Sequence, residues 1–336
     1  MPNRHAVERM LTAALTAALA STGAFAANTP SPPLPTPSAA VTPPPARTPA
    51  PRPDLVRIVR LKLSAADLAS AEAWTEDWRR DVGADATWLD ARAWLARGAW
   101  MLRDYDRALA FAREVRAAIP EAEPELLIPL GAALEVEGRI RAEREGAAAG
   151  VRFFREATAL SPDIAFRSRM WKNVNRLELV GQPAPPLGTA RHVGPTPPSL
   201  AALRGRPVLL FLWNYRCGDC RASAPTLAAI NSRFGPLGLT ILAPTRLYGA
   251  KSDGSAATPE EESAEIGREL ATKYAELGSL SVPIDTETMV RYGASATPTF
   301  VLIDRDGVVR LYEPTRLTVT ALSEAIEPLI ASAAAR

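Results

Sequence analysis

The chain is poor in cysteine and histidine, with only two of each among its 336 residues. A structural zinc site takes about four such ligands, and His192 is far in sequence from both cysteines. Two cysteines are also too few for a disulfide framework. We therefore expect no metal site and no disulfide scaffold, and the cysteines are better explained by chemistry. We expect His192 to be a linker or strand residue and not a catalytic base.

Charge of one sign is also scarce, because 39 Lys and Arg residues face 37 Asp and Glu residues, for a formal net charge of +2. Basic residues are not interleaved with aromatic ones, so no nucleic-acid partner is expected. An apolar content of 47% and a charged content of 23% are typical of a globular protein. The length allows two domains.

The apolar run near the start, Leu11–Ala20, is short for a membrane span and is interrupted by threonine. It follows Arg4 and Arg9 and precedes the small residues of Ala24-Phe25-Ala26. This pattern predicts a signal peptide over residues 1–26, cleaved near Ala26, and a periplasmic or otherwise exported soluble protein. An uncleaved N-terminal membrane anchor is the alternative. No cysteine follows the cleavage site, so we expect no lipid attachment there.

Two segments rich in proline divide the remainder of the chain. Residues 27–54 contain eleven prolines between Thr29 and Pro53, a composition that favours extended polyproline II. We interpret this segment as a disordered spacer, with a partner-binding motif as the alternative. Residues 181–198 form a second linker rich in proline and glycine. The two predicted domains are therefore 55–180 and 199–336.

The first predicted domain, 55–180, has a helical pattern dominated by Ala, Leu, Arg and Glu, with Ser64 as a predicted N-cap. One stretch resembles a tetratricopeptide repeat, a helical hairpin that binds other proteins. The matching positions are Leu95, Ala96, Tyr105, Ala108, Val115 and Pro120. A second, degenerate unit covers Glu125 to Pro162 and has Phe154 and Ala157 in matching places. A plain bundle of helical hairpins is an equal alternative.

Five tryptophans lie within 27 residues of this helical segment. Several share the spacing of one helix face, which favours packing in the core, and an exposed aromatic groove is the alternative. They are Trp74, Trp78, Trp88, Trp94 and Trp100.

The second predicted domain, 199–336, alternates strands with helices. A continuous apolar run, Pro207–Trp213, predicts a central strand that is buried on both faces. Asp306-Gly307 joins two further strands and is typical of a hairpin turn. The full set of expected elements is a strand over 207–213, a helix over 217–234, a strand over 239–242, a helix over 259–277, strands over 299–303 and 308–312, and a helix over 317–330.

Both cysteines lie directly after the central strand, in the sequence "CGDC" from Cys217 to Cys220. A cysteine at the start of a helix faces unpaired backbone N–H groups, which favour the thiolate. We expect Cys217 to attack a substrate disulfide and Cys220 to resolve the resulting mixed disulfide.

Residues 181–330 resemble the TlpA-like thioredoxins, a family of exported thiol–disulfide oxidoreductases. The matching stretches are "GQPAPPL" from Gly181, "SLAALRGRPVLLFLW" from Ser199, "CGDC" with Pro225 beyond it, and "YGASATPTFVLIDRDGVV" from Tyr292. The resemblance implies an α/β thioredoxin-like domain, a central mixed sheet flanked by helices, preceded here by the all-α domain. It also implies a cis peptide bond between Thr297 and Pro298 that faces the dithiol. We expect Thr297, Pro298 and Trp213 to bind substrate, and no cofactor beyond the redox-active Cys217–Cys220 disulfide.

The surroundings of the dithiol depart from the family pattern. Arg216 and Asp219 stand where the family has Trp and Pro. Ser223 and Phe211 stand where related proteins carry Glu and Asp. Cations favour a thiolate and a neighbouring carboxylate opposes it, so we expect Arg216, Asp219 and Arg221 to set the electrostatics of the site. Their balance leaves the redox direction open.

The sequence therefore favours an exported enzyme that reduces protein disulfides. Its expected partners are proteins with disulfides or thiols, an upstream membrane or periplasmic electron donor, and a protein bound by the helical domain. The first alternative is a helical binding module whose thioredoxin-like domain carries a structural or regulatory disulfide. A thiol peroxidase is the minor alternative, because Asn214 stands where peroxiredoxins have threonine.

Overall fold

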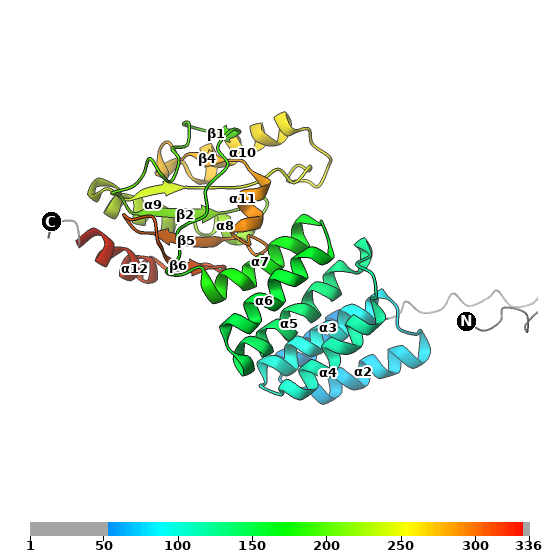
Figure 1. Cartoon of the computed structure of the whole chain (residues 1–336). Coiled ribbons are helices and arrows are strands. Elements are labelled where there is room, and N and C mark those ends of the chain that lie inside the picture. The colour runs from blue at the N-terminus through cyan, green and yellow to red at the C-terminus, as the bar shows by residue number, and fades with distance from the viewer. Residues whose placement is uncertain (1–52, 332–336) are drawn as a thin grey trace, which may run out of the picture. The chain divides into compact units, whose positions relative to one another are not determined.

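The structure is a computed structural model that describes residues 53–331. The described residues form one compact unit (Figure 1), in which a helical region is followed by a region built on a β-sheet. The predicted signal peptide over 1–26 and nearly all of the proline-rich segment over 27–54 lie outside the described residues. Between residues 53 and 331, no helix is both long enough and apolar enough to cross a lipid bilayer.

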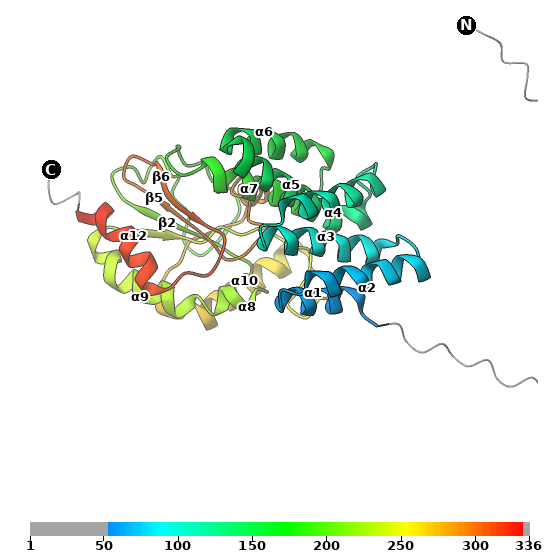
Figure 2. The same ribbon diagram turned by 90° about the horizontal axis from the view of Figure 1, so that it is seen from below.

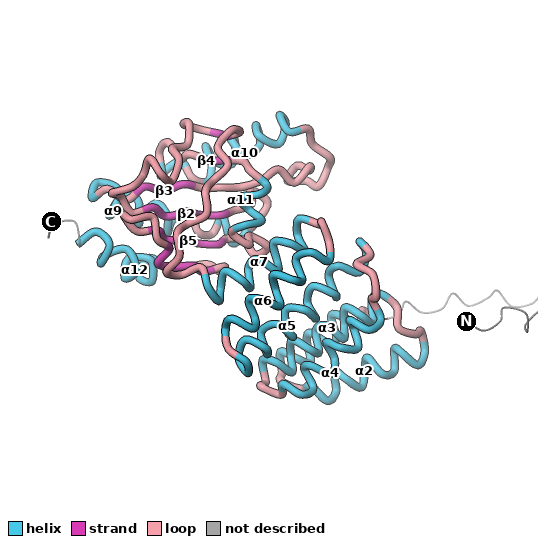
Figure 3. Tube along the Cα trace, in the orientation of Figure 1, coloured by secondary structure: helices cyan, strands magenta, loops and turns pink. Residues whose placement is uncertain are grey.

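The helical region consists of seven α-helices that pack as successive hairpins (Figure 3). Each helix contacts the next along the chain. The odd-numbered helices also contact one another: α3 contacts α1 and α5, and α5 contacts α7. The odd-numbered helices therefore share one face. The bounds are α1 Leu55–Ser64, α2 Leu68–Asp81, α3 Ala86–Met101, α4 Tyr105–Ala118, α5 Leu127–Glu145, α6 Ala147–Ala157 and α7 Ile164–Glu178.

Aspartate N-caps set the beginnings of five of these helices. In each, the carboxylate accepts a hydrogen bond from the backbone N–H three residues later, which satisfies a donor that has no partner within the helix. The prediction that Ser64 caps a helix is wrong, because Ser64 is the last residue of α1 and Asp67 caps α2. The capping residues are Asp54, Asp67, Asp85, Asp104 and Asp163.

The predicted helical region is confirmed, and small side chains lie at its centre. Ala96 of α3 and Ala108 and Val115 of α4 are fully buried, so the two helices approach closely. The more specific resemblance to a tetratricopeptide repeat stays a prediction. Of the five tryptophans, Trp88 is buried in the core, whereas Trp74 is 39% exposed and departs from the core interpretation. The other three, Trp78, Trp94 and Trp100, are half-buried against the core.

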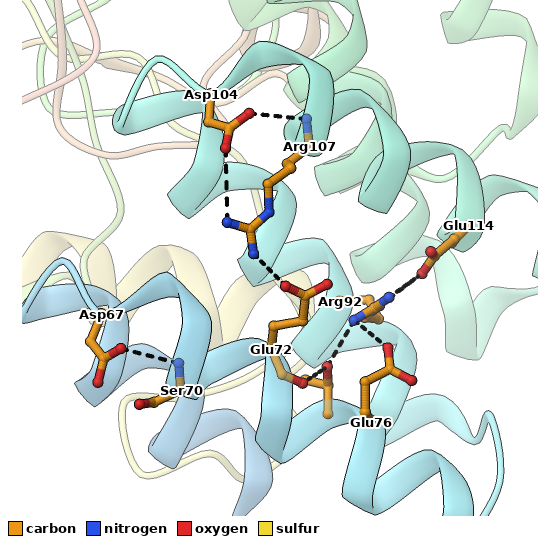
Figure 4. Close-up of polar contacts among 9 residues, drawn as sticks. Asp67, Ser70, Glu72, Glu76, Arg92, Asp104, Arg107 and Glu114 are labelled. Carbon is orange, nitrogen blue, oxygen red and sulfur yellow. Dashed lines mark hydrogen bonds and ion pairs between the residues drawn. The ribbon is translucent and has the colours of Figure 1, made fainter.

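A buried arginine connects three of these helices. The Arg92 side chain of α3 is 3% exposed and forms ion pairs of 2.9 Å with Glu76 and 2.6 Å with Glu114. It also donates a hydrogen bond of 2.9 Å to the hydroxyl of Thr75. Figure 4 shows Arg92 between Glu76 and Glu114. Both carboxylates are partly exposed to solvent, whereas the Arg92 guanidinium is buried. The free-energy cost of burying its charge is therefore offset by these contacts.

We expect Arg92→Met to lower the free energy of unfolding by about 2–3 kcal/mol, because it removes several charged hydrogen bonds from a buried site. Arg107→Met is the matched control. The Arg107 side chain is 40% exposed and pairs with Glu72 and Asp104, so its loss should cost about 1 kcal/mol or less. Urea denaturation of both variants measures the difference. Equal losses would contradict a special role for Arg92.

The second region contains a four-stranded mixed sheet in the order β3-β2-β5-β6. The central strand β2 is parallel to β3 and antiparallel to β5, and β5 forms an antiparallel hairpin with β6. The prediction that the central strand is buried on both faces is confirmed, since all five residues of β2 are buried. The strands are β2 Val208–Leu212, β3 Thr240–Leu242, β5 Thr299–Ile303 and β6 Val309–Glu313.

Alternate residues of β2 enter two separate hydrophobic cores, because successive side chains of a strand point to opposite faces. Leu209 and Phe211 pack with the helices α9 (Ala224–Phe234), α10 (Pro259–Lys273) and α12 (Val319–Ala331). The even-numbered β2 residues pack on the other face with Met289 of α11 (Thr286–Arg291). Figure 2 shows α9 and α12 together on one side of the strands. A mixed sheet of this order, flanked by helices, is a thioredoxin-like fold, and the predicted fold class is confirmed.

The segment 181–198 is folded against the second region and is not a free spacer. The backbone N–H of Gly181 donates to the carbonyl of Val309, and that of Ala184 donates to the carbonyl of Gly307. His192 lies in the short strand β1 (His192–Val193), which pairs with β4 (Val282–Pro283). These strands are too short for a periodic pattern to reveal them in the sequence.

Candidate active site

The register of the sheet brings the two predicted halves of the site together. In the antiparallel pair, Leu212 at the end of β2 lies opposite Thr299 at the start of β5. The residues after β2 and the residues before β5 therefore meet at the same end of the two central strands. Cys217 follows β2, and Thr297-Pro298 precedes β5 with a cis peptide bond, as predicted.

The sulfur of Cys217 contacts both its partner cysteine and the proline loop. It accepts a hydrogen bond from the backbone N–H of Cys220, with 3.3 Å between N and Sγ. Its thiol donates to the carbonyl of Thr297, with 3.2 Å between Sγ and O. Cys217 is partly exposed and both cysteines are thiols in this structure. The Cys217 sulfur thus lies beside the backbone of Thr297, the residue before the cis peptide bond.

Cys220 is fully buried, with no exposed side-chain area. Burial is the main cause that raises the pKa of its thiol, and the hydrogen bond with Cys217 adds to it. The two thiols are therefore unequal: one is accessible and the other is buried and reluctant to ionise. A nucleophile and a resolving thiol need this asymmetry.

The predicted helix over 217–234 is broken in two. Helix α8 covers only Gly218–Arg221, with Cys217 as its N-cap, and α9 starts at Ala224. Pro225 lies in the first turn of α9, where its missing N–H costs no hydrogen bond. The backbone N–H of Cys220 contacts Cys217, but the dipole of a four-residue helix is small.

The three charged residues predicted to set the electrostatics lie in different surroundings. Arg216 is exposed, and its backbone N–H donates to the side chain of Asn214. Asp219 points into solvent, 68% exposed, with Arg316 at 3.7 Å. Arg221 donates to the carboxylate of Glu269 at 2.6 Å. This hydrogen bond is the main reason that the pKa of Arg221 is raised.

Trp213 is 1% exposed, which corrects the prediction that it binds substrate. Its indole N–H donates to the carbonyl of Ala243 at 2.9 Å. Its ring stacks on Phe211 and meets the ring of Tyr274 edge-on, with centroids 5.2 Å apart. Trp213 therefore supports the site from within the core. The run "VLLFLW" already placed it in a buried strand, but only the fold shows that no face remains for a substrate.

Sequence reasoning did not single out three residues of helix α10 and the turn after it. Glu269 holds Arg221, and the fully buried Glu262 accepts hydrogen bonds from the backbone N–H groups of Tyr248 and Gly249. Tyr274 packs on the aromatic residues beneath the dithiol. Their pattern in the sequence is that of an ordinary charged amphipathic helix, so no local signal marked them.

The hydroxyl of Tyr274 is buried and has no hydrogen-bond partner among residues 53–331. We therefore expect Tyr274→Phe to leave the free energy of unfolding unchanged or to raise it by about 1 kcal/mol, since an unpaired buried polar group is removed. Tyr292→Phe is the matched control. The buried Tyr292 hydroxyl donates to the carbonyl of Pro185 at 2.6 Å, and its loss should cost about 1–2 kcal/mol. Chemical denaturation measures both, and a larger loss at Tyr274 would contradict the assignment.

No group of three or more His, Cys, Asp and Glu side chains in the described part of the chain is arranged to hold a metal ion.

No protein-family model and no curated protein matches this chain. Several solved structures do. A Chlorobium tepidum protein described as thiol:disulfide interchange protein DsbE is 28% identical, with a TM-score of 0.35, over 46% of this chain and 96% of its own. A secreted Mycobacterium tuberculosis disulfide oxidoreductase is 21% identical, with a TM-score of 0.30, over 38% of this chain and 86% of its own. At these TM-scores the fold assignment rests on the strand order and register described above.

Proposed function

We propose that this protein is an exported thiol–disulfide oxidoreductase that reduces disulfides in protein substrates. The observation that carries the proposal is the position of the Cys217 sulfur, in contact with both the N–H of Cys220 and the carbonyl of Thr297. This arrangement supplies an accessible nucleophile, a buried resolving thiol and the backbone of Thr297 beside the sulfur that a substrate would meet. Export rests on the signal peptide predicted from residues 1–26.

Reduction proceeds in two exchange steps. The Cys217 thiolate attacks one sulfur of the substrate disulfide, so that a mixed disulfide forms and the other substrate sulfur leaves as a thiolate, which takes up a proton. Cys220 then loses its proton and attacks the Cys217 sulfur. The second substrate thiol is released, and the dithiol has become the Cys217–Cys220 disulfide. Two electrons pass to the substrate, so an upstream membrane or periplasmic donor must return two electrons for the next cycle.

The charges around the dithiol favour the reducing direction. Strongly oxidising sites owe their potential to a stabilised reduced form, with its thiolate held by cations or N–H groups. Here Arg221 is paired with Glu269 and Arg316 is paired with Asp219, so neither of these two guanidinium groups is left unpaired. One backbone donor, the N–H of Cys220, reaches the Cys217 sulfur within the described residues. A dithiol with few cations and N–H groups directed at its accessible sulfur is typical of a reductant.

The reduction potential of the Cys217–Cys220 pair, measured by equilibration with a dithiol redox buffer, tests the direction. We expect a value near that of thioredoxin, about −270 mV, and a value near about −120 mV would instead indicate an oxidase. The Cys220→Ser variant tests the activity itself. It should accumulate mixed disulfides with exported proteins through Cys217, and these should be absent when Cys217 is also replaced by serine. Failure to trap any protein would favour a structural or regulatory disulfide.

A further inference from the structure

The face shared by the odd-numbered helices is hollowed into a groove. Two adjoining hollows, of about 80 and 400 Å³, share Trp94 and Arg97 of α3 in their walls. Their remaining walls come from α1, α3, α5, α7 and Leu102 after α3, and from none of the even-numbered helices. The larger hollow is within the usual size of a ligand site, and the smaller one extends it toward α5 and α7. We call the two together the odd-helix groove.

Positive charge exceeds negative charge along this groove. Its walls contain four arginines and two carboxylates. Arg60 and Arg97 are exposed, lie 4.8 and 5.4 Å from the ring centroid of Trp94, and form no ion pair within residues 53–331. Their charges are therefore available to a ligand. The lining arginines are Arg60, Arg97, Arg139 and Arg169, and the carboxylates are Asp90 and Glu135.

At the α7 end of the groove, the carboxylate of Glu135 forms ion pairs with three cations. Glu135 contacts Arg139 at 2.8 Å, Lys172 at 3.0 Å and Arg169 at 3.1 Å. Burial would raise the pKa of Glu135, but the charges of these neighbours together lower it to about 2. Burial also lowers the pKa of Arg139 and of Lys172. Three partly buried cations thus share the charge of Glu135, and Asp90 adds a second negative charge that acts on Arg169 and Arg60. The cations along the groove still outnumber its carboxylates, which leaves positive charge for an acidic ligand.

The groove also offers apolar contacts beside these charges. Met101 and Leu102 at the end of α3 are 67% and 47% exposed, and both line the larger hollow. Trp94 and Trp100 present aromatic rings between the arginines. Mixed apolar and cationic walls suit a polypeptide that carries both apolar and acidic side chains. They suit a phosphate chain poorly, because Asp90 and Glu135 would repel it and the whole chain has a net charge of only +2.

We propose that the odd-helix groove binds an acidic segment of a partner protein, with carboxylates against Arg97 and Arg139 and apolar side chains against Trp94 and Met101. The partner expected for the helical region would then be a protein with an acidic segment. It does not depend on the dithiol, because Cys217 and Cys220 do not line either hollow.

Calorimetric titration of the whole protein with two matched peptides tests the proposal. One peptide alternates glutamate with leucine, and in the other glutamine replaces every glutamate. We expect binding of the acidic peptide only, weakened by added salt because exposed charges are screened. Arg97→Gln should raise the Kd about tenfold, the effect of losing one charge-assisted contact. Arg141→Gln is the control, since Arg141 is also exposed, on α5, but stacks on Phe153 outside the groove.

Three results would overturn the proposal: equal binding of the glutamine peptide, equal weakening by Arg97→Gln and Arg141→Gln, or tighter Arg97-dependent binding of a single-stranded oligonucleotide or of anionic lipid vesicles. Reduction of a small aromatic disulfide serves as the separate readout for the redox site. It should be unchanged in Arg97→Gln, whereas Cys217→Ser should remove it and leave peptide binding intact. A failure of the groove and a failure of the oxidoreductase are therefore distinguishable.

Discussion

Replacement of Cys217 by alanine is expected to lower the turnover of a protein disulfide substrate by roughly 10³-fold or more, because it removes the nucleophile. The Cys217 sulfur is the partly exposed one and contacts the backbone of Thr297. Asp219→Asn is the control within the motif. The Asp219 side chain is 68% exposed, so its change should alter the rate by a few-fold only. Coupled reduction assays measure both variants.

The two cysteines should also differ in direct chemical labelling. Iodoacetamide reacts with thiolates, so the reduced protein should be modified at Cys217 and spared at Cys220, which is fully buried and has a raised pKa. In the Cys217→Ala variant, Cys220 should stay unmodified at neutral pH and should react only as the pH is raised toward its pKa. Mass spectrometry of the labelled peptides checks this. Equal labelling of the two cysteines would contradict the assigned roles.

Gly293→Ala is expected to lower the free energy of unfolding by about 3 kcal/mol or more. Gly293 follows α11 with a φ of 64°, a conformation that costs a residue with a side chain about 1–2 kcal/mol. A Cβ atom built there would lie 2.3 Å from the backbone nitrogen of Lys172 in α7. Helix backbone cannot rotate away as a side chain can, so α7 and α11 would have to separate.

Gly205→Ala separates the two causes of this loss. Gly205 has a φ of 86°, yet a Cβ atom there would meet nothing within 4 Å. The substitution should therefore cost about 1 kcal/mol, from the backbone conformation alone. Guanidinium denaturation of both variants gives the difference. If Gly293→Ala cost no more than Gly205→Ala, the close packing of α7 on the residues after α11 would be wrong.

Much of the second region could be predicted because its signals are local. The apolar run of β2 and the Asp306-Gly307 turn act over a few residues, and the structure has both. The cis bond before Pro298 was expected from the family resemblance and is present. The same local reasoning failed for the helix predicted over 217–234. In the structure α8 ends at Arg221 and a new helix, α9, begins at Ala224, with Pro225 in its first turn.

Residues that act through distant partners could not be found this way. Arg221 was expected to act on the dithiol, but Glu269, 48 residues later, neutralises it. Trp213 was assigned to the substrate, and the packing of Tyr274 against it shows why it is buried.

By itself, the sequence determined the dithiol, the buried central strand and the helical nature of the first region. Each of these follows from side-chain chemistry and spacing along one segment. Only the tertiary structure decided which thiol is accessible, which charges are neutralised and that the arginines of α1, α3, α5 and α7 line one groove. The physical reason is that exposure and charge pairing depend on how segments far apart in the chain pack together, and no local pattern records that packing.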